Sequence, residues 1–259
     1  MPHGVIMRLK GDSEKIGGTE LSSLFHGALM ELVDTDYAAF LHENQLHPYS
    51  QSVVYDHDNL IWRVNVLNEE AEEMILGPLL ADSLKEIDIK HKGVRLLIAE
   101  KQECQVSFQE LVKEYYFGEK SRFLTIRFLT PTSFKQDGQY CLFPDVRLIF
   151  QSLMKKYDQA STESSVFSEE LLEHYSKYAS IVKYRLQSAV FYMEGVKIPG
   201  FKGDITIRIG GPQQMSNMAW MLAKFGEYAG VGIKTGIGMG AIKVLDSDRR
   251  WKEVKSRNE

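Results

Sequence analysis

The order of the predicted strands and helices constrains the fold of this chain most strongly, because the same order occurs twice. In the first half, short apolar runs indicate strands, and apolar residues at helical spacing indicate helices. The expected elements are strand 5–9, helix 21–32 with a short helical piece after residue 36, strands 49–55 and 60–66, helix 68–75, and strand 84–89. This order is β-α-β-β-α-β. Residues 93–106 are expected to extend the sheet as an extra hairpin arm.

The second half repeats this order in a looser form. The expected elements are strand 123–129, helices over 146–154 and 171–178, strands 184–193 and 203–209 as a hairpin pair, helix 212–228, and strand 241–245. Units of this order are ferredoxin-like. We therefore expect the α+β class, with two tandem ferredoxin-like (RRM-like) domains over residues 1–120 and 121–259. Since a fold of this kind fixes no function, the function has to be argued from a site.

The composition indicates a globular cytoplasmic protein. The chain of 259 residues is 44% hydrophobic and 25% charged, which is ordinary for a soluble domain. No run of eighteen apolar residues occurs, and the first residues lack the apolar core of a signal peptide, so we expect neither membrane insertion nor export. Cys104 and Cys141 lie far apart in the sequence and are expected to be reduced core residues.

The charge is distributed unevenly along the chain. The formal net charge is −4, which by itself argues against a nucleic-acid partner. Residues 180–259, however, contain thirteen Lys or Arg against seven Asp or Glu, a local charge of +6, so the preceding 179 residues carry −10. A local excess of positive charge is what a polyanion site needs, because neutralising phosphates releases counterions. The alternative is a solvated basic tail, and the charge count leaves both interpretations open.

A glycine-rich stretch, GVGIKTGIGMG over residues 230–240, lies within this basic part. A dinucleotide-binding fingerprint needs a strand before its glycines and a helix after them, whereas here the predicted helix comes first. No Walker pattern fits either, because Lys234 and Thr235 lack the required preceding glycine. The stretch is therefore either a loop shaped around a polynucleotide or a tight structural turn.

Three of the seven histidines lie close together in the sequence: His26 on the flank of the first predicted helix, His42 at the end of the following helical piece, and His47. Their spacing fits no zinc motif. Imidazole can act as a general acid or base near neutral pH, so two of these side chains could form a catalytic pair. A histidine at a helix edge is more often an ordinary surface residue, and the spacing alone does not decide between these interpretations.

Several motifs together resemble a known family. The stretch Gly230-Val-Gly232, five residues, and Gly238-Met-Gly240 is similar to the carboxy-terminal glycine signature of the RAMP superfamily. Three segments of the first half, FHGALM (25–30), FLHE (40–43) and PYSQS (48–52), resemble the amino-terminal region of Cas6, the CRISPR precursor-RNA endoribonuclease family, and FLTPTSF (128–134) resembles its interdomain strand. The resemblance extends over nearly the whole chain in the same order.

This resemblance implies an endoribonuclease that needs neither metal nor cofactor. Such an enzyme cleaves CRISPR repeat RNA in precursor transcripts by attack of the 2′-hydroxyl, leaves 2′,3′-cyclic phosphate and 5′-hydroxyl ends, and so generates guide RNAs. The implied partners are the repeat RNA, subunits of an interference complex and a second copy of the chain, with no membrane partner. One alternative is a RAMP-type subunit that binds CRISPR RNA without cutting it. Another is a metal-binding or small-molecule regulatory protein on the same fold.

The resemblance also implies roles for single residues. His42 is similar to the catalytic histidine of the family, His26 is expected to be its partner acid or base, and His47 falls near a position that is often a lysine. Ser50 and Ser52 are expected to donate to a phosphate. The loop is expected to bind RNA through Lys234, Thr235 and its glycines: Gly230, Gly232, Gly236, Gly238 and Gly240. Side chains expected to follow the RNA backbone are Lys183, Arg185 and Lys202, with Lys197 and Arg208 beside them.

Overall fold

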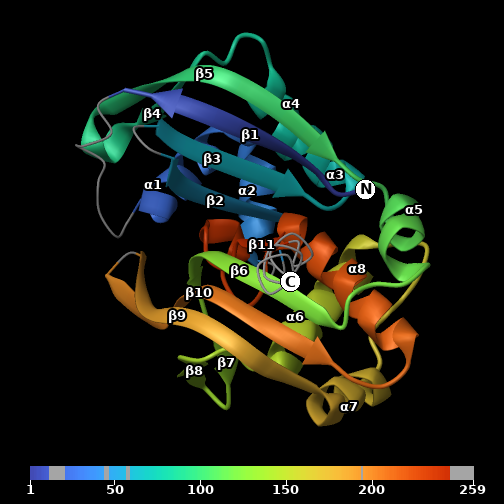
Figure 1. The fold of residues 1–259 in the computed structure, drawn as a ribbon. Helices are drawn as coiled ribbons and strands as arrows, with labels where there is room; N and C mark the ends of the chain where they lie inside the picture. Colours follow the sequence, from blue (N-terminus) through green and yellow to red (C-terminus); the bar gives the residue numbers. More distant parts are fainter. Residues whose placement is uncertain (12–20, 44–46, 57–58, 194, 246–259) are drawn as a thin grey trace, which may run out of the picture.

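The computed structural model describes residues 1–259 except 12–20, 44–46, 57–58, 194, 246–259 and the side chain of His42. The described residues form two larger antiparallel sheets, one from each half of the chain, and one small hairpin sheet. In Figure 1 most of the helices lie behind the two larger sheets, which turn their other faces toward the viewer. The expected α+β class, with two tandem ferredoxin-like units, is confirmed.

The first sheet has the strand order β2-β3-β1-β5-β4. Its strands are β1 (His3–Lys10), β2 (Tyr49–Asp56), β3 (Asn59–Val66), β4 (Glu86–Ile89) and β5 (Val94–Gln105). Alternate residues of β1 are buried in the core of this half, namely Val5, Met7 and Leu9. This alternation follows from the two-residue period of a strand. The helices of this half therefore cover one face of the sheet.

The strand that completes this sheet is not the one expected from the sequence. Residues 84–89 were expected in that place and 93–106 as an extra arm, and this assignment is wrong. In the structure β5 pairs with β1, from His3 opposite Gln105 to Lys10 opposite Leu97. The four-residue β4 pairs with β5 at the edge of the sheet. Only β5, with twelve residues, is long enough to pair along the whole of β1.

The helices of the first half follow β1 and β3, and a 3-10 turn follows β4. They are α1 (Leu21–Leu32), α2 (Thr35–Glu43), α3 (Glu69–Ala71), the π-helical η2 (Glu72–Leu76), α4 (Gly77–Leu80) and the 3-10 turn η3 (Lys90–Lys92). The helix expected over 68–75 begins as predicted, because the Asn68 side chain accepts a hydrogen bond of 2.9 Å from the Ala71 amide. It continues beyond its expected end, to Leu80.

The second sheet has the strand order β11-β6-β10-β9. Its strands are β6 (Phe123–Thr132), β9 (Ala179–Met193), β10 (Val196–Ile209) and β11 (Ile242–Leu245). β10 begins at Val196, so most of the residues expected in the hairpin turn belong to the strand, and Pro199 lies opposite Val190. A short hairpin that the sequence did not predict, β7 (Phe134–Gln136) and β8 (Gln139–Cys141), follows β6.

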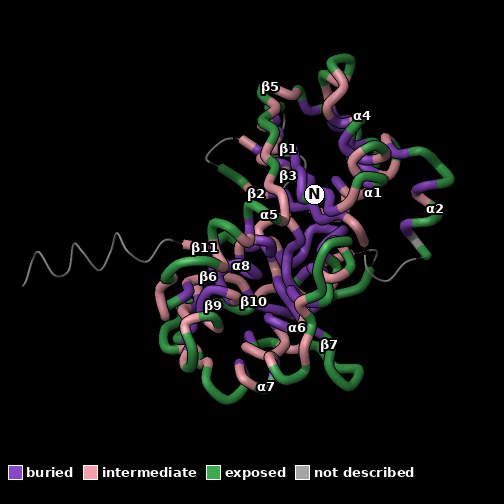
Figure 2. The backbone as a smooth tube through the Cα atoms, turned by 90° about the vertical axis from the view of Figure 1, so that its right-hand side faces the viewer, coloured by how far each residue is buried: buried purple, intermediate pink, exposed green. Residues whose placement is uncertain are grey.

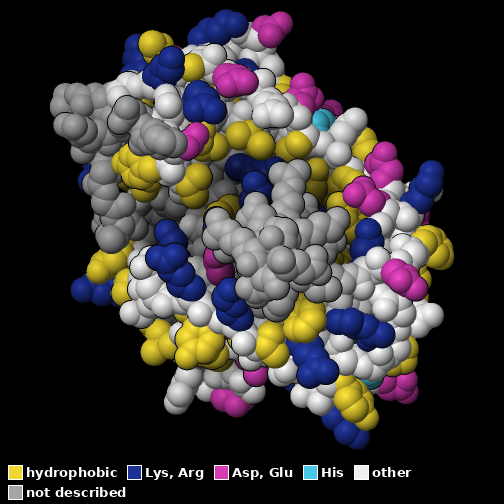
Figure 3. All heavy atoms as spheres, in the orientation of Figure 1, with side chains coloured by type: hydrophobic (Ala, Val, Ile, Leu, Met, Phe, Trp, Pro, Cys, Tyr) yellow, Lys and Arg dark blue, Asp and Glu magenta, His cyan; other side chains and the backbone are white. Residues whose placement is uncertain are grey.

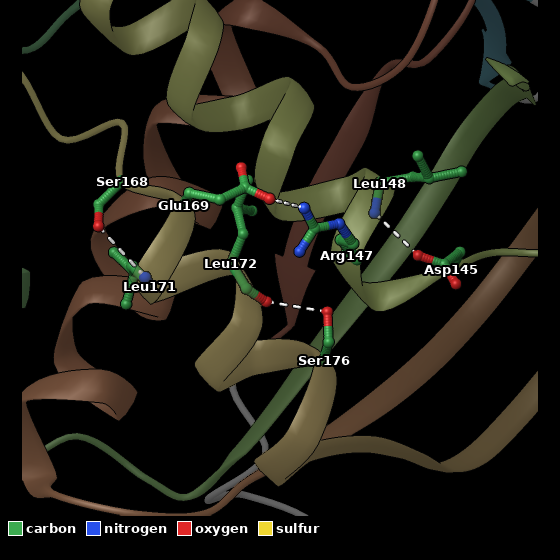
Figure 4. A network of polar contacts seen from close by, with 8 residues as sticks. All are labelled: Asp145, Arg147, Leu148, Ser168, Glu169, Leu171, Leu172 and Ser176. Atoms are coloured by element: carbon green, nitrogen blue, oxygen red, sulfur yellow. Dashed lines mark hydrogen bonds and ion pairs between the residues drawn. The ribbon is translucent and has the colours of Figure 1, made fainter.

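The helices of the second half are α5 (Phe108–Leu111), the π-helical η4 (Val112–Tyr116), α6 (Val146–Ala160), α7 (Glu169–Tyr178), α8 (Gln213–Ala229) and the 3-10 turn η5 (Thr235–Ile237). Figure 4 shows how α6 and α7 begin. Asp145 accepts from the Leu148 amide at 2.9 Å and Ser168 from the Leu171 amide at 3.3 Å, while Arg147 of α6 is paired with Glu169 of α7. No helix of the described residues is long and apolar enough to cross a bilayer.

The two halves have separate hydrophobic cores, and Figure 2 shows buried backbone in both. The segment of α5 and η4 packs against the second core, with Leu111 buried and Phe108 edge-on to Tyr157 of α6. The predicted division near residue 120 lies after this segment, between η4 and β6, and stays a prediction. Both cysteines are free, as expected. They are half-buried, however, and not the core residues that the sequence predicted.

Candidate functional site

His26 lies on α1 beside the buried face of that helix. α1 buries Leu21, Phe25, Ala28 and Leu29, at the spacing of one helix face, which leaves His26 half-buried at the flank. Tyr49, the first residue of β2, is buried, and its Oη is 3.4 Å from His26 Nδ1. Burial raises the pKa of Tyr49, with a smaller contribution from Tyr37. The phenol therefore stays neutral at physiological pH beside the imidazole.

His47 lies next to the same tyrosine. Its half-buried ring is tilted by 50° to that of Tyr49, with the centroids 5.5 Å apart. Gly236 of η5 lies against both rings, because a Cβ placed on it would be 3.1 Å from His47 Cδ2 and 3.1 Å from Tyr49 Cζ. The glycine-rich loop near the end of the chain is therefore in contact with a cluster of ring side chains from the first fifty residues.

His42 is the residue for which the resemblance implies the main catalytic role. Its backbone lies in α2, where His42 is the last residue but one and Glu43 is the last. The carboxylate of Asp34 starts this helix by accepting from the amides of Asp36 and Tyr37, at 2.9 and 3.3 Å. The side chain of His42 lies outside the described part of the chain, so its catalytic role stays a prediction.

The glycines of the loop permit close approach of backbone to backbone. A Cβ on Gly240 would lie 2.0 Å from the Val231 carbonyl oxygen, and one on Gly232 would lie 2.3 Å from the Ser133 carbonyl oxygen. Both glycines also have positive φ, 70° and 80°. The loop folds back on itself through the Val231 amide, which donates to the Gly240 carbonyl at 2.8 Å. These contacts within the protein make the loop compact without a ligand.

Most amides of the loop donate hydrogen bonds within the protein. Hydrogen bonds to protein acceptors are donated by Gly230, Val231, Gly232, Ile233, Ile237, Gly238, Met239 and Gly240. Within the described part of the chain, the amides of Lys234, Thr235 and Gly236 have no acceptor. Lys234 is exposed at the tip in the left-handed conformation, with φ of 56°, and Thr235 is buried. Gly236 is buried as well, so Lys234 is the part of this segment that a ligand can reach from solvent.

Ser50 and Ser52, which were expected to contact phosphate, are both buried. The Ser50 hydroxyl donates to the Tyr228 carbonyl at the end of α8 and accepts from Asn65 Nδ2 at 3.1 Å. Ser52 lies opposite Arg63 of β3. In this structure Ser50 joins the first sheet to the second half of the chain, and the phosphate contacts of both serines stay predictions.

The predicted backbone-contacting cations lie on β9 and β10. Lys183 and Arg185 of β9 are exposed, and Lys202 of β10 is half-buried. Arg185 belongs to a row across the second sheet in which Lys243 of β11, Arg127 of β6, Asp204 of β10 and Arg185 are successive neighbours. Arg127 makes a bidentate pair with Asp204, at 2.7 and 2.8 Å, which raises the pKa of its guanidinium.

The sequence did not single out Arg127 or Lys243. Each is one charged residue in an otherwise unremarkable strand, and only strand pairing places them beside Arg185. Lys and Arg side chains are spread over this face of the second half in Figure 3. The row contains three cations and one anion, which suits a polyanionic ligand.

Comparisons with known proteins agree with this arrangement. Residues 126–242 match the family model described as CRISPR-associated endoribonuclease Cas6. A protein of that name from Streptococcus thermophilus is 36% identical over 226 residues, which cover 87% of this chain and 91% of the relative. One from Mycobacterium tuberculosis is 32% identical over 220 residues, covering 85% of this chain and 70% of the relative.

Solved structures share the fold. A Cas6 product complex superposes with a TM-score of 0.78 at 25% identity, covering 95% of this chain and 100% of that one. A Thermus thermophilus Cas6 structure gives a TM-score of 0.72 at 24% identity, covering 95% and 98%. Because the Streptococcus relative is matched over nearly its whole length, the comparison with it establishes the family. The chain belongs to the Cas6 family of CRISPR-associated endoribonucleases.

Proposed function

We propose that this protein cleaves CRISPR repeat RNA within precursor transcripts, without a metal, by attack of the 2′-hydroxyl on the adjacent phosphate. The products are a 2′,3′-cyclic phosphate and a 5′-hydroxyl end, and the released units serve as guide RNAs. The observation that carries the proposal is the contact of Gly236 with His47 and Tyr49, the latter of which reaches His26. It puts acid–base side chains beside a loop with free amides and an exposed lysine.

The chemistry needs only a base for the 2′-hydroxyl proton and an acid for the departing 5′-oxygen. An unperturbed imidazole has a pKa of about 6.5, so near neutral pH it can fill either role. We assign these two roles to His26 and His42, in either order. Tyr49 orients the His26 ring through its contact at Nδ1, and His47, when protonated, supplies positive charge next to Gly236.

The same proposal assigns RNA binding to the loop and the second sheet. We assign the phosphate at the cleavage site to Lys234 and to the amides of Thr235 and Gly236. Phosphates further along the RNA are bound by Lys183, Arg185 and Lys202, together with Lys243 and the exposed side of Arg127. Contacts of this kind bind by charge and release of counterions, and recognise shape more than sequence.

The proposed partners are the repeat RNA and, after cleavage, subunits of an interference complex that receives the product. A second copy of the chain is a further proposed partner. The relatives named Cas6 and a solved Cas6 product complex support RNA as the substrate class. The alternative of a RAMP-type subunit that binds without cutting is decided by the experiment below.

The test incubates the protein with a labelled repeat RNA in EDTA and compares it with His42→Ala and His26→Ala. We expect cleavage in EDTA by the wild-type protein, a loss of about 100- to 10,000-fold in each variant, and no cleavage of an RNA with 2′-deoxyribose at the cut. Tight binding without cleavage by the wild type would show the binding subunit instead. If the wild-type protein neither binds nor cleaves the RNA, the result would favour the alternative of a metal-binding or small-molecule regulatory protein.

A further inference from the structure

Lys156 of α6 is a buried lysine that has no part in the proposed chemistry. Only 7% of the surface of Lys156 is exposed. Its Nζ lies 3.2 Å from the carbonyl oxygens of both Ala229 and Gly230, and 3.0 Å from Thr235 Oγ1. All three hydrogen-bond partners are uncharged, and each belongs either to the end of α8 or to the glycine-rich loop.

The three partners suit the lysine amino group, which donates three hydrogen bonds when protonated and, when neutral, donates two and can accept one from the Thr235 hydroxyl. Two of them are carbonyls at the carboxyl end of α8, where a helix leaves unpaired carbonyl groups and a partial negative charge. Burying a lysine costs free energy unless its hydrogen bonds are made. An apolar side chain of similar length could fill the space but could not join these three groups.

Thr235 connects this lysine to the site. Its Cγ2 occupies the centre of the loop, because a Cβ on Gly230 or Gly240 would lie 2.8 or 3.1 Å from it. The next residue along the chain is Gly236, which lies against His47 and Tyr49. The position of Thr235 therefore sets the position of the loop against the histidine cluster.

We propose that Lys156 is a positioning residue that holds the glycine-rich loop against the histidine cluster by joining Thr235 to the carboxyl end of α8. Lys156 is too deeply buried to contact RNA, so its effect on cleavage passes through the loop. This inference rests on the proposed function, in which that loop binds the RNA at the cleavage site.

The test compares Lys156→Met and Thr235→Val with the matched control Lys155→Met, which changes the exposed neighbouring lysine on the same helix. The first measurement is hydrogen exchange of the loop, residues 230–240, in the protein without RNA. We expect exchange to become at least about tenfold faster in both variants and to stay unchanged in the control. This measurement needs no activity, so it holds even if the protein proves not to cut repeat RNA. Unchanged exchange in both variants would overturn the proposal.

The second measurement is single-turnover cleavage. Since a small displacement near reacting groups costs about 10- to 100-fold in rate, we expect a loss of that size in each variant. The double variant should lose no more than the worse single one, because both changes break the same link. Thr235→Ser keeps the hydroxyl and should restore most of the rate. Should Lys156→Met fail to fold, Thr235→Val and Thr235→Ser still decide the question. Additive losses, or wild-type rates in Lys156→Met, would contradict the proposal.

Discussion

At the scale of single residues, the site depends on one contact between distant parts of the chain. Gly236 has no side chain, which lets the loop approach the rings of His47 and Tyr49 within contact distance. Tyr49 in turn touches His26. A change at Gly236 should therefore affect cleavage more than stability.

Gly236→Ala tests this contact. The new methyl group would lie 3.1 Å from both rings, so the neighbours must shift by a few tenths of an ångström. We expect single-turnover cleavage to fall about tenfold, with a small change in melting temperature. The control is Gly77→Ala in α4, where a Cβ would meet nothing within 4 Å apart from its chain neighbours. That variant should cleave normally. Normal cleavage by Gly236→Ala would contradict the proposed site.

At the scale of elements, the second sheet arranges charges that are far apart in the sequence. Lys243, Arg127, Asp204 and Arg185 come from four strands and become neighbours through antiparallel pairing. Asp204 neutralises one of the cations through the bidentate pair with Arg127. Arg185 and Lys243 are the fully exposed members of the row and can follow phosphates.

Arg185→Ala and Lys243→Ala should each weaken binding of repeat RNA. In a plot of log affinity against log salt concentration, each should reduce the slope by about one unit, as expected for one lost phosphate contact. Titrations of uncleavable 2′-deoxy RNA at several salt concentrations measure this. Lys92→Ala, an exposed lysine of η3, is the control and should leave the slope unchanged. An unchanged slope in both sheet variants would exclude this face from the RNA path.

At the scale of the whole molecule, the end of α8 joins the two halves. The Tyr228 carbonyl accepts from Ser50 of the first sheet, and the next two carbonyls bind Lys156 of the second half. Burial lowers the pKa of Lys156 from 10.5 to about 7. Between these two values the unfolded chain holds a proton that the folded chain lacks, so raising the pH favours the folded state.

The free energy of unfolding should show this dependence on pH. From pH 7 toward pH 10.5, the contribution of Lys156 to the stability of the wild type should increase, and below pH 7 it should stay constant. Other groups titrate in the same range, so the quantity to compare is the difference between wild type and Lys156→Met, from denaturant unfolding at each pH. A difference that does not change between pH 7 and 10 would show that Lys156 has an ordinary pKa in the folded protein.

The sequence alone was enough for much of the fold and for part of the site. The positions of most helices and strands follow from local periodicity, and the caps at Asn68 and Ser168 act on residues three positions away. Lys156 carried a signal as well, since it lies on the apolar face of α6 with Ile149 and Leu153, where a charged residue is unusual. That signal shows burial, but it does not show what the side chain binds.

By itself, the sequence determined the alternation of helices and strands, the glycine motif and the set of candidate histidines, because each of these depends on residues close together in the chain. Only the tertiary structure decided that β5 rather than β4 lies beside β1, that Gly236 meets Tyr49, that four strands align a row of charges, and that Lys156 holds Thr235. These features depend on strand register and on contacts between residues that are far apart in the sequence. Local periodicity carries no information about either.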